Sequence, residues 1–194
     1  MVSFLKKIFV KFEGCMIYLV RHGQTDWNLM GRMQGQTDIM LNQKGIADAH
    51  NLAQQIVKKG VNKIISSDLK RARQTAEIIN SYLNVPLLFD KRLREIGYGD
   101  IEGLIKKDIP LEMWEMFNNT PEKINAESFA KIYERIHSFF YELDRDEDTL
   151  IVTHGGAIRM MLYLKKYPHI FDLAEYQKSY QHLEIQNTTL IPWD

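Results

Sequence analysis

The spacing of apolar residues changes several times along the chain, and each change predicts a new element. Residues 16–20 are apolar and partly β-branched, and the polar run Arg21-His22-Gly23 ends them, which predicts a buried strand that leads into a loop. Between Gly45 and Gly60, apolar residues recur at helical spacing, and the second glycine suits a helix end. Residues 63–66 are predicted to form the next, short strand.

The alternation of strand and helix continues toward the C-terminal end. Apolar residues at strand or helix spacing predict four more elements: a helix over about 69–83, a strand over 86–89, a helix over about 127–143 and a strand over 149–153. Gly155-Gly156 is predicted to open another helix. Residues 181–191 are predicted to be strand-like, with a turn at Asn187.

Strands that alternate with helices of this length favour parallel pairing, with helices on both faces of the sheet. We therefore predict an α/β fold, a three-layer αβα sandwich with a mainly parallel central sheet. In such sheets, ligands collect beyond the carboxyl ends of the strands. Arg21-His22 and His154 are both predicted at such ends, so we expect chemistry at this edge of the sheet.

The composition limits the number of domains and the class of partner. The chain has 194 residues, 45% of them apolar, which is enough for one full core. We predict a single domain over 16–194, with 104–125 as a small cap-like segment. Twenty-five Lys and Arg balance twenty-five Asp and Glu, which argues against nucleic acid or a membrane as a partner.

Cysteine content and the N-terminal residues indicate the compartment. The single cysteine, Cys15, has no partner for an internal disulfide, and no apolar run approaches the length needed to span a bilayer, so we expect a cytoplasmic location. Residues 1–15 carry Lys6, Lys7 and Lys11, which interrupt any signal-peptide apolar region. We interpret 1–15 as an N-terminal extension. One hypothesis is that Met16 is the natural start, because the first strand begins there.

Four segments far apart in the sequence each place a charged or nucleophilic group at a predicted loop: residues 21–23, 67–73, 94–95 and 153–156. A single histidine is more often a structural or surface residue than a catalyst, because its ring makes many kinds of hydrogen bond. We keep that interpretation for the four histidines outside these segments: His50, His137, His169 and His182.

Taken together, the segments resemble the histidine phosphatase superfamily, the phosphoglycerate mutase-like group. The first signature of that family is present in full as Leu19-Val20-Arg21-His22-Gly23-Gln24-Thr25 and runs on to Asn28. The likeness covers nearly everything from Met16 to the C-terminus. It continues through further motifs: Gly31-Arg32-Met33-Gln34-Gly35, Leu41 with Gly45, Ser66-Ser67-Asp68-Leu69, Arg71-Ala72, Gln74-Thr75-Ala76, Leu93-Arg94-Glu95-Ile96, Gly99 and Glu102-Gly103.

The resemblance implies a metal-independent phosphatase without a cofactor, in which His22 becomes a phosphohistidine. It also implies that Glu95 is the general acid and base. Three further residues are implied to hold the phosphoryl oxygens: Arg21, Arg71 and His154. Five more are expected to contact phosphate or substrate: Gly23, Asn28, Gln34, Gly35 and Gly155.

Physical chemistry supports these assignments independently. Phosphoryl transfer requires stabilisation of charge spread over three oxygens, and two guanidinium groups supply planar, forked donors for that purpose. The same positive charges should lower the pKa of His22 and keep its ring neutral and able to attack. A helix that opens after Gly155 would direct free N–H groups at the phosphate, and for Gly156 a simple turn role is an equal alternative.

Three alternatives remain open from the sequence. Two histidines and one glutamate also fit a metal site, but arginines beside them would repel a divalent cation. A mutase must exclude water, which in this family takes a long insertion; only 58 residues separate Glu95 from His154, and the run Ile96-Gly97-Tyr98-Gly99-Asp100-Ile101-Glu102-Gly103 resembles the phosphatase branch. The third alternative is a phospho-ligand binder without catalysis.

The substrate is expected to be a small phosphorylated metabolite, a phosphomonoester. Substrates in the family include sugar phosphates, phosphoglycerates, the ribazole phosphate of cobalamin synthesis and fructose 2,6-bisphosphate, and the sequence does not choose among them. Two interpretations of Trp114, Met113 and Phe117 are open: contact with an apolar or planar part of a substrate, and apolar packing within the cap-like segment, which we favour. Relatives commonly carry Gly-Glu-Ser where Ala126-Glu127-Ser128 stands here, which weakens analogy to any one substrate. The chain is expected to be a monomer or a homodimer.

Overall fold

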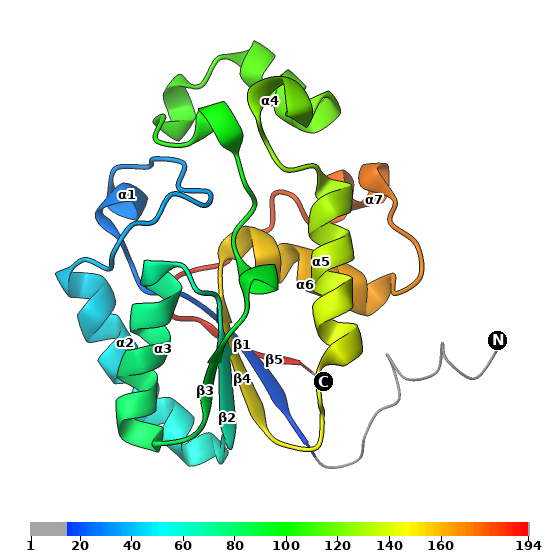
Figure 1. The fold of residues 1–194 in the computed structure, drawn as a ribbon. Helices are drawn as coiled ribbons and strands as arrows, with labels where there is room; N and C mark the ends of the chain where they lie inside the picture. Colours follow the sequence, from blue (N-terminus) through cyan, green and yellow to red (C-terminus); the bar gives the residue numbers. More distant parts are fainter. Residues whose placement is uncertain (1–14, 194) are drawn as a thin grey trace.

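The structure is a computed structural model that describes residues 15–193. Its centre is one sheet of five strands in the order β3-β2-β4-β1-β5 (Figure 1). The strands are β1 (Ile17–Arg21), β2 (Lys63–Ser66), β3 (Leu87–Phe89), β4 (Thr149–Thr153) and β5 (Leu190–Trp193). The first four pair in parallel, and β5 runs antiparallel to β1, so the sheet is mainly parallel as predicted.

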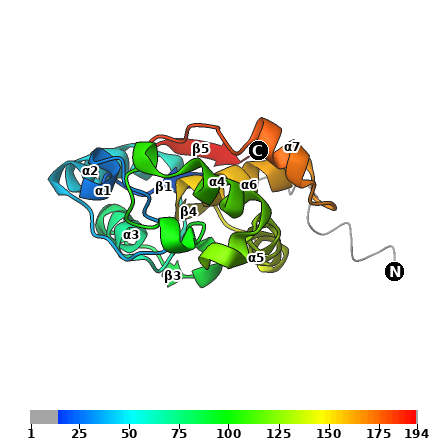
Figure 2. The same ribbon diagram turned by 90° about the horizontal axis from the view of Figure 1, so that it is seen from above.

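Helices cover both faces of the sheet. The α-helices are α1 (Asp26–Leu29), α2 (Gln43–Ile56), α3 (Lys70–Leu83), α4 (Leu111–Asn119), α5 (Phe129–Glu142), α6 (Gly155–Lys166) and α7 (Leu173–Ser179). Short 3-10 helices lie at η2 (Val57–Lys59), η3 (Lys91–Leu93), η4 (Gly99–Ile101), η5 (Lys106–Asp108) and η6 (Pro121–Ile124). Figures 1 and 2 show α2 and α3 on one side of the sheet and α5 and α6 on the other. None of the helices in residues 15–193 is long and apolar enough to cross a membrane.

The alternation of side chains along β1 divides the core into two layers. Ile17 and Leu19 pack with α5 and α6, whereas Tyr18 and Val20 pack with α2 and α3. Successive residues of a strand point to opposite faces, so a strand buried on both faces reads as a continuous apolar run. The three-layer αβα sandwich predicted from the sequence is therefore confirmed.

Most predicted elements are confirmed with small shifts at their ends. The strands at 63–66 and 149–153 have the predicted bounds. The helix expected between Gly45 and Gly60 begins two residues earlier, at Gln43, because the side chain of Asn42 accepts a hydrogen bond from Gly45 N and caps it. Gly60 ends the helical run with a φ of 71°, a conformation that glycine adopts without strain.

The prediction for residues 181–191 was wrong in large part. The turn at Asn187 is present, but 181–189 form no strand, and β5 starts only at Leu190. Carbonyl groups of this segment accept hydrogen bonds from arginine side chains instead of from a neighbouring strand: Ile185 O from Arg21 Nη1 at 2.5 Å and Leu183 O from Arg159 Nη1 at 3.3 Å. The spacing of apolar residues does not predict which carbonyl groups bind arginine side chains.

The segment 104–125, predicted to be cap-like, holds η5, α4 and η6. In Figure 1 it lies beyond the carboxyl ends of the strands, next to α1. Phe117 is buried there and packs edge-on against Trp114 and Phe129. The N-terminal extension predicted over 1–15 lies outside the described residues except for Cys15, which is exposed and free.

Candidate active site

The parallel pairing of β1 and β4 brings two histidines together. Arg21 is paired with Thr153 in the sheet, so His22 and His154 follow at the same edge. The backbone N–H of His22 donates to Thr153 O at 2.9 Å, and the two imidazole rings lie 5.1 Å apart. Two histidines separated by more than a hundred residues thus become neighbours because both strands end at this edge.

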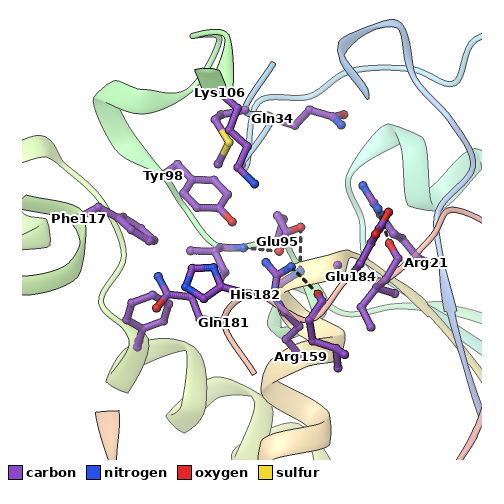
Figure 3. Close-up of a pocket in the computed structure, with 18 of the residues that line it drawn as sticks. Arg21, Gln34, Glu95, Tyr98, Lys106, Phe117, Arg159, Gln181, His182 and Glu184 are labelled. Carbon is purple, nitrogen blue, oxygen red and sulfur yellow. Dashed lines mark hydrogen bonds between the residues drawn. The ribbon is translucent and has the colours of Figure 1, made fainter. Parts of the chain in front are cut away.

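A pocket of about 800 Å³ opens at this edge of the sheet. Arg21 and Glu95 line it at the sheet, and Phe117 lines it from the cap-like segment (Figure 3). His22 is also one of the lining residues. Residues 181–185, from the irregular C-terminal segment, form another wall. The pocket therefore has a charged end and a partly apolar end.

The ring of His22 is held in one tautomer. Its Nδ1 lies 2.7 Å from the carbonyl oxygen of Gly23, and because a carbonyl only accepts, Nδ1 must carry the proton. Nε2 accepts a hydrogen bond from Arg71 Nε at 3.3 Å. Burial, followed by the charges of Arg71 and Arg21, holds the pKa of His22 well below its usual 6.5. The ring is neutral at physiological pH, with a lone pair on Nε2.

Arg71 enters the site from the first turn of α3 and is completely buried. Its Nη2 donates to Gly35 O at 2.6 Å and its Nη1 to Thr37 O at 2.9 Å. Burial lowers the pKa of Arg71 to about 10, with Glu95 the largest of the charges that oppose the shift. The guanidinium thus stays positive at pH 7, with two of its five N–H groups uncommitted.

His154 is buried beside His22 and is not among the residues that line the pocket. Its Nε2 is 2.8 Å from Ser67 Oγ. Burial, Arg71 and His22 hold the pKa of His154 well below 6.5, so the ring is neutral. If the hydroxyl of Ser67 donates to Nε2, Nδ1 carries the proton, and Nδ1 is a buried nitrogen without a partner among the described residues. A buried unpaired donor next to two arginines fits an anion.

Arg21 completes the cationic end of the pocket. Its Nη1 donates to Ile185 O at 2.5 Å, and its Nε is buried without a partner in the described residues. Burial lowers the pKa of Arg21, with Glu95 the largest of the charges that oppose the shift. No described carboxylate forms an ion pair with Arg21 or Arg71, which leaves both charges available to a ligand.

Two backbone amides hold the carboxylate of Glu95. Its Oε1 accepts from Ile96 N at 2.9 Å and its Oε2 from Gly156 N at 3.1 Å. A Cβ at position 156 would lie 2.3 Å from Glu95 Oε1, whereas a Cβ at Gly155 would make only ordinary contacts with Arg21, starting at 3.6 Å. The simple turn role considered for Gly156 is therefore wrong. Close approach of Glu95 requires this glycine.

The predicted contact residues divide into two groups. Asn28, Gln34, Gly35 and Gly155 line the pocket, although Asn28 also forms a capping box with Thr25 at the start of α1. Gly23 does not line it. Its N–H donates to Thr75 Oγ1 at 3.0 Å, and a Cβ there would lie 2.6 Å from Gly45 O, so its role in the described structure is close packing.

Sequence reasoning missed several pocket residues. His182, interpreted as structural or surface, is exposed and lines the pocket. Arg159 also lines it, and the signal was available: Arg159 is three residues after Gly156 in the predicted helix, which places both on one face. The other pocket side chains not predicted are Arg32, Met33, Ile96, Tyr98, Lys106, Leu111, Asn118, Phe129, Tyr176, Gln181, Leu183, Glu184 and Ile185.

Within residues 15–193, no group of three His, Cys, Asp or Glu side chains is arranged to hold a metal ion. The sequence profile of the histidine phosphatase superfamily (branch 1) matches residues 17–190. The chain belongs to the histidine phosphatase superfamily. The family resemblance expected from the sequence is thereby confirmed.

Two bacterial relatives of this superfamily member carry different names. An uncharacterized phosphatase, PhoE of Bacillus subtilis (strain 168), is 38% identical over 151 residues, which is 75% of each chain. A probable phosphoglycerate mutase, GpmB of Yersinia pestis (strain Pestoides F), is 39% identical over 158 residues, 75% of this chain and 72% of that one. Sequence similarity alone therefore supports an enzyme of the phosphatase and mutase superfamily.

Two solved structures share the fold over most of the chain. A mycobacterial glucosyl-3-phosphoglycerate phosphatase complexed with VO3 has a TM-score of 0.77 and 26% identity, covering 92% of this chain and 90% of that one. A variant of a phosphoserine phosphatase from Entamoeba histolytica, in complex with phosphoserine, has a TM-score of 0.75, 26% identity and the same coverage. Both are named as phosphatases.

Proposed function

We propose that this protein is a phosphatase that hydrolyses a small phosphomonoester through a phosphohistidine on His22, with Glu95 as general acid and base. The observation that carries the proposal is the state of His22: a buried, neutral ring with its proton on Nδ1 and its Nε2 facing Arg71. A neutral imidazole beside fixed positive charges is a nucleophile suited to an anionic phosphoryl group.

In the first step, Nε2 of His22 attacks phosphorus, the N–P bond forms, and the bond from phosphorus to the ester oxygen breaks. The proton of Glu95 passes to the leaving oxygen, and an alcohol departs. Phosphorylation gives the ring a positive charge, which the hydrogen bond from Nδ1 to Gly23 O stabilises. Arg21, Arg71 and the Nδ1–H of His154 are proposed to hold the three phosphoryl oxygens.

In the second step, water attacks the phosphohistidine, and Glu95 accepts a proton from that water. The N–P bond breaks, inorganic phosphate leaves, and His22 returns to its neutral state with Glu95 protonated. No step requires a metal ion, so we propose that activity persists in excess chelator. The short segment between Glu95 and His154 supports hydrolysis over mutase transfer, which would need a longer closing segment to exclude water.

The pocket beyond the phosphoryl site supports a substrate with a second negative charge. Five Arg and Lys side chains but only two carboxylates line it. Arg159 is the one we assign to the substrate: its Nε is buried without a partner, and it forms no ion pair with a described residue. Figure 3 shows Arg159 near Glu95, with Tyr98 facing the same space. We propose that Arg159 binds a carboxylate of the substrate.

The names of structural relatives agree with this choice, since glucosyl-3-phosphoglycerate and phosphoserine both carry a carboxylate. We therefore propose a phosphorylated hydroxy acid or amino acid as the substrate class. The proposed compartment is the cytoplasm, which rests on the single cysteine.

A matched pair of substrates tests the proposal. 3-Phosphoglycerate and glycerol 3-phosphate differ only in a carboxylate against a hydroxymethyl group. We expect release of phosphate from both and a kcat/KM about 10- to 100-fold higher for 3-phosphoglycerate, the effect of one charge-assisted contact. Absence of hydrolysis of these and of p-nitrophenyl phosphate would contradict the proposed function, whereas equal rates would contradict only the substrate class.

A further inference from the structure

Glu102, in the segment that follows Glu95, accepts more hydrogen bonds than any other described carboxylate near the pocket. Its Oε1 accepts from Gln36 N at 2.9 Å and from Tyr98 N at 3.0 Å. Its Oε2 accepts from Thr37 N at 2.9 Å and from Thr37 Oγ1 at 2.6 Å. Each of its oxygens therefore has two donors, and all four bonds go to an ionised carboxylate, the stronger class of hydrogen bond.

The loop that Glu102 holds is the loop that holds Arg71. The carbonyl oxygens of Gly35 and Thr37 accept from the two terminal nitrogens of Arg71, and Gln36 lies between them. Gly35 has a φ of 52°, and a Cβ there would lie 1.9 Å from Glu102 Oε1. Glycine is thus required for the carboxylate to reach the loop.

The same carboxylate is connected to the segment that carries the general acid. Tyr98 N, one of its donors, lies three residues after Glu95. From the loop, Gln36 Nε2 donates to Glu95 O at 3.2 Å. Glu102 consequently fixes the phosphate-binding guanidinium and the backbone of the general acid relative to each other.

We propose that Glu102 is a positioning residue, which acts on the reaction through loop 35–37 and Arg71. This inference rests on the proposed function and goes beyond it, because Glu102 touches neither His22 nor the pocket in the described structure. The carbonyl groups of Gly35 and Thr37 fix the direction of the Arg71 guanidinium. The positions of these carbonyl groups depend in turn on how firmly loop 35–37 is held. Small errors in the direction of a charged donor cost transition-state stabilisation.

The test replaces Glu102 with its amide. In Glu102→Gln, one oxygen becomes an NH2 group, which must face two backbone N–H donors in place of Oε1, or Thr37 N and the Thr37 hydroxyl in place of Oε2. Because the hydroxyl can turn and accept, at least one of the four hydrogen bonds is lost, and the remaining ones no longer go to a charged group. Removal of one hydrogen-bond donor from such a site lowers kcat about 100- to 1,000-fold. Removal of a residue that acts through the donor should lower the rate by less. We expect kcat/KM for p-nitrophenyl phosphate to fall about 10- to 100-fold, with a parallel loss of orthovanadate affinity in calorimetry.

The matched control is Asp148→Asn, in which a carboxylate that accepts from Met16 N at 2.6 Å, at the opposite edge of the sheet, is changed in the same way. This variant should leave kcat/KM unchanged. A second background separates positioning from general damage: in Arg71→Lys, the fork is absent, so adding Glu102→Gln should change kcat/KM less than threefold, because effects through one residue are not additive.

If Glu102→Gln fails to fold, Thr37→Val removes only the 2.6 Å hydrogen bond from the hydroxyl and should show a smaller loss with the same dependence on Arg71. An equal loss in the wild-type and Arg71→Lys backgrounds, or no loss in a folded variant, would overturn the proposal.

If the wild-type protein hydrolyses no phosphomonoester but binds orthovanadate, the proposed function fails while calorimetry still tests Glu102. If it does not bind orthovanadate, both fail.

Discussion

The carbonyl oxygen of Gly23 lies 2.7 Å from Nδ1 of His22, the residue directly before it, and also accepts from Asn187 Nδ2 at 3.2 Å. Asn187 Nδ2 donates to His22 O as well, at 2.7 Å. The turn at Asn187 thus holds the backbone that fixes the tautomer of the proposed nucleophile. A chain segment more than 160 residues away in sequence sets which ring nitrogen is free to react.

The two buried neutral histidines predict how stability depends on pH. The pKa values of His22 and His154 are well below 6.5 in the folded protein and close to 6.5 once unfolded. The unfolded chain therefore binds more protons as pH falls below 6.5, and stability is lost in that direction. We expect the free energy of unfolding in urea to fall between pH 7 and pH 5, by up to about 1.4 kcal/mol per pH unit for each histidine. His154→Gln should show a shallower slope, and an unchanged slope would contradict the account.

Substitution of Gly156 by alanine is expected to disable Glu95. The new Cβ would lie 2.3 Å from Glu95 Oε1 and 2.7 Å from Ile96 Cδ1, so the carboxylate must move. We expect kcat to fall about 100-fold or more, the scale of general acid catalysis. In Gly155→Ala, the adjacent substitution, the new Cβ would make only ordinary contacts, so kcat should fall at most about tenfold. Similar losses for the two variants would show that steric contact with Glu95 is not the cause.

Glu95→Gln should separate the two halves of the reaction. Glutamine cannot donate an acidic proton, so phosphoenzyme formation should stay fast with p-nitrophenyl phosphate, whose leaving group needs no proton, and slow about 100-fold or more with an alkyl phosphate. Rapid-quench measurement of the burst with both substrates checks this. Equal slowing with the two leaving groups would assign Glu95 a role other than general acid.

Arg159→Gln should reduce selectivity and leave the phosphoryl chemistry intact. We expect kcat/KM for 3-phosphoglycerate to fall about 10- to 100-fold and that for glycerol 3-phosphate to change little. Arg73→Gln, on the exposed side of α3 where Arg73 meets Glu77 at 3.8 Å, is the control and should leave both values unchanged. Equal losses for both substrates in Arg159→Gln would place the arginine at the phosphoryl group instead.

Most of the fold could be predicted because apolar spacing alone determines which faces of β1, α3 and α5 are buried. The positions of Arg21, His22 and His154 followed from the same spacing, since each ends a strand or directly follows one. The sheet topology alone is enough to bring these three residues to the same edge of the sheet.

The remaining features depend on polar contacts over long sequence distances. Residues 181–185 form no strand, and two of their carbonyl groups accept hydrogen bonds from the side chains of Arg21 and Arg159 instead. The local sequence around 181–185 gives no sign of these contacts. Glu102 was noticed only as part of a motif, because two of its backbone donors, Gln36 N and Thr37 N, lie 66 and 65 residues away in the sequence. Pocket residues such as His182 are likewise placed by the path of a loop rather than by periodicity.

The most direct test of the central claim is to trap the phosphoryl group. Wild-type protein mixed with a ³²P-labelled phosphomonoester and quenched in alkali should carry label that is stable in base, lost in acid, and located by mass spectrometry at His22. His22→Ala should carry none and should lose nearly all turnover. A His22→Ala protein that retains near-normal turnover, or wild-type label on any other residue, would contradict the account.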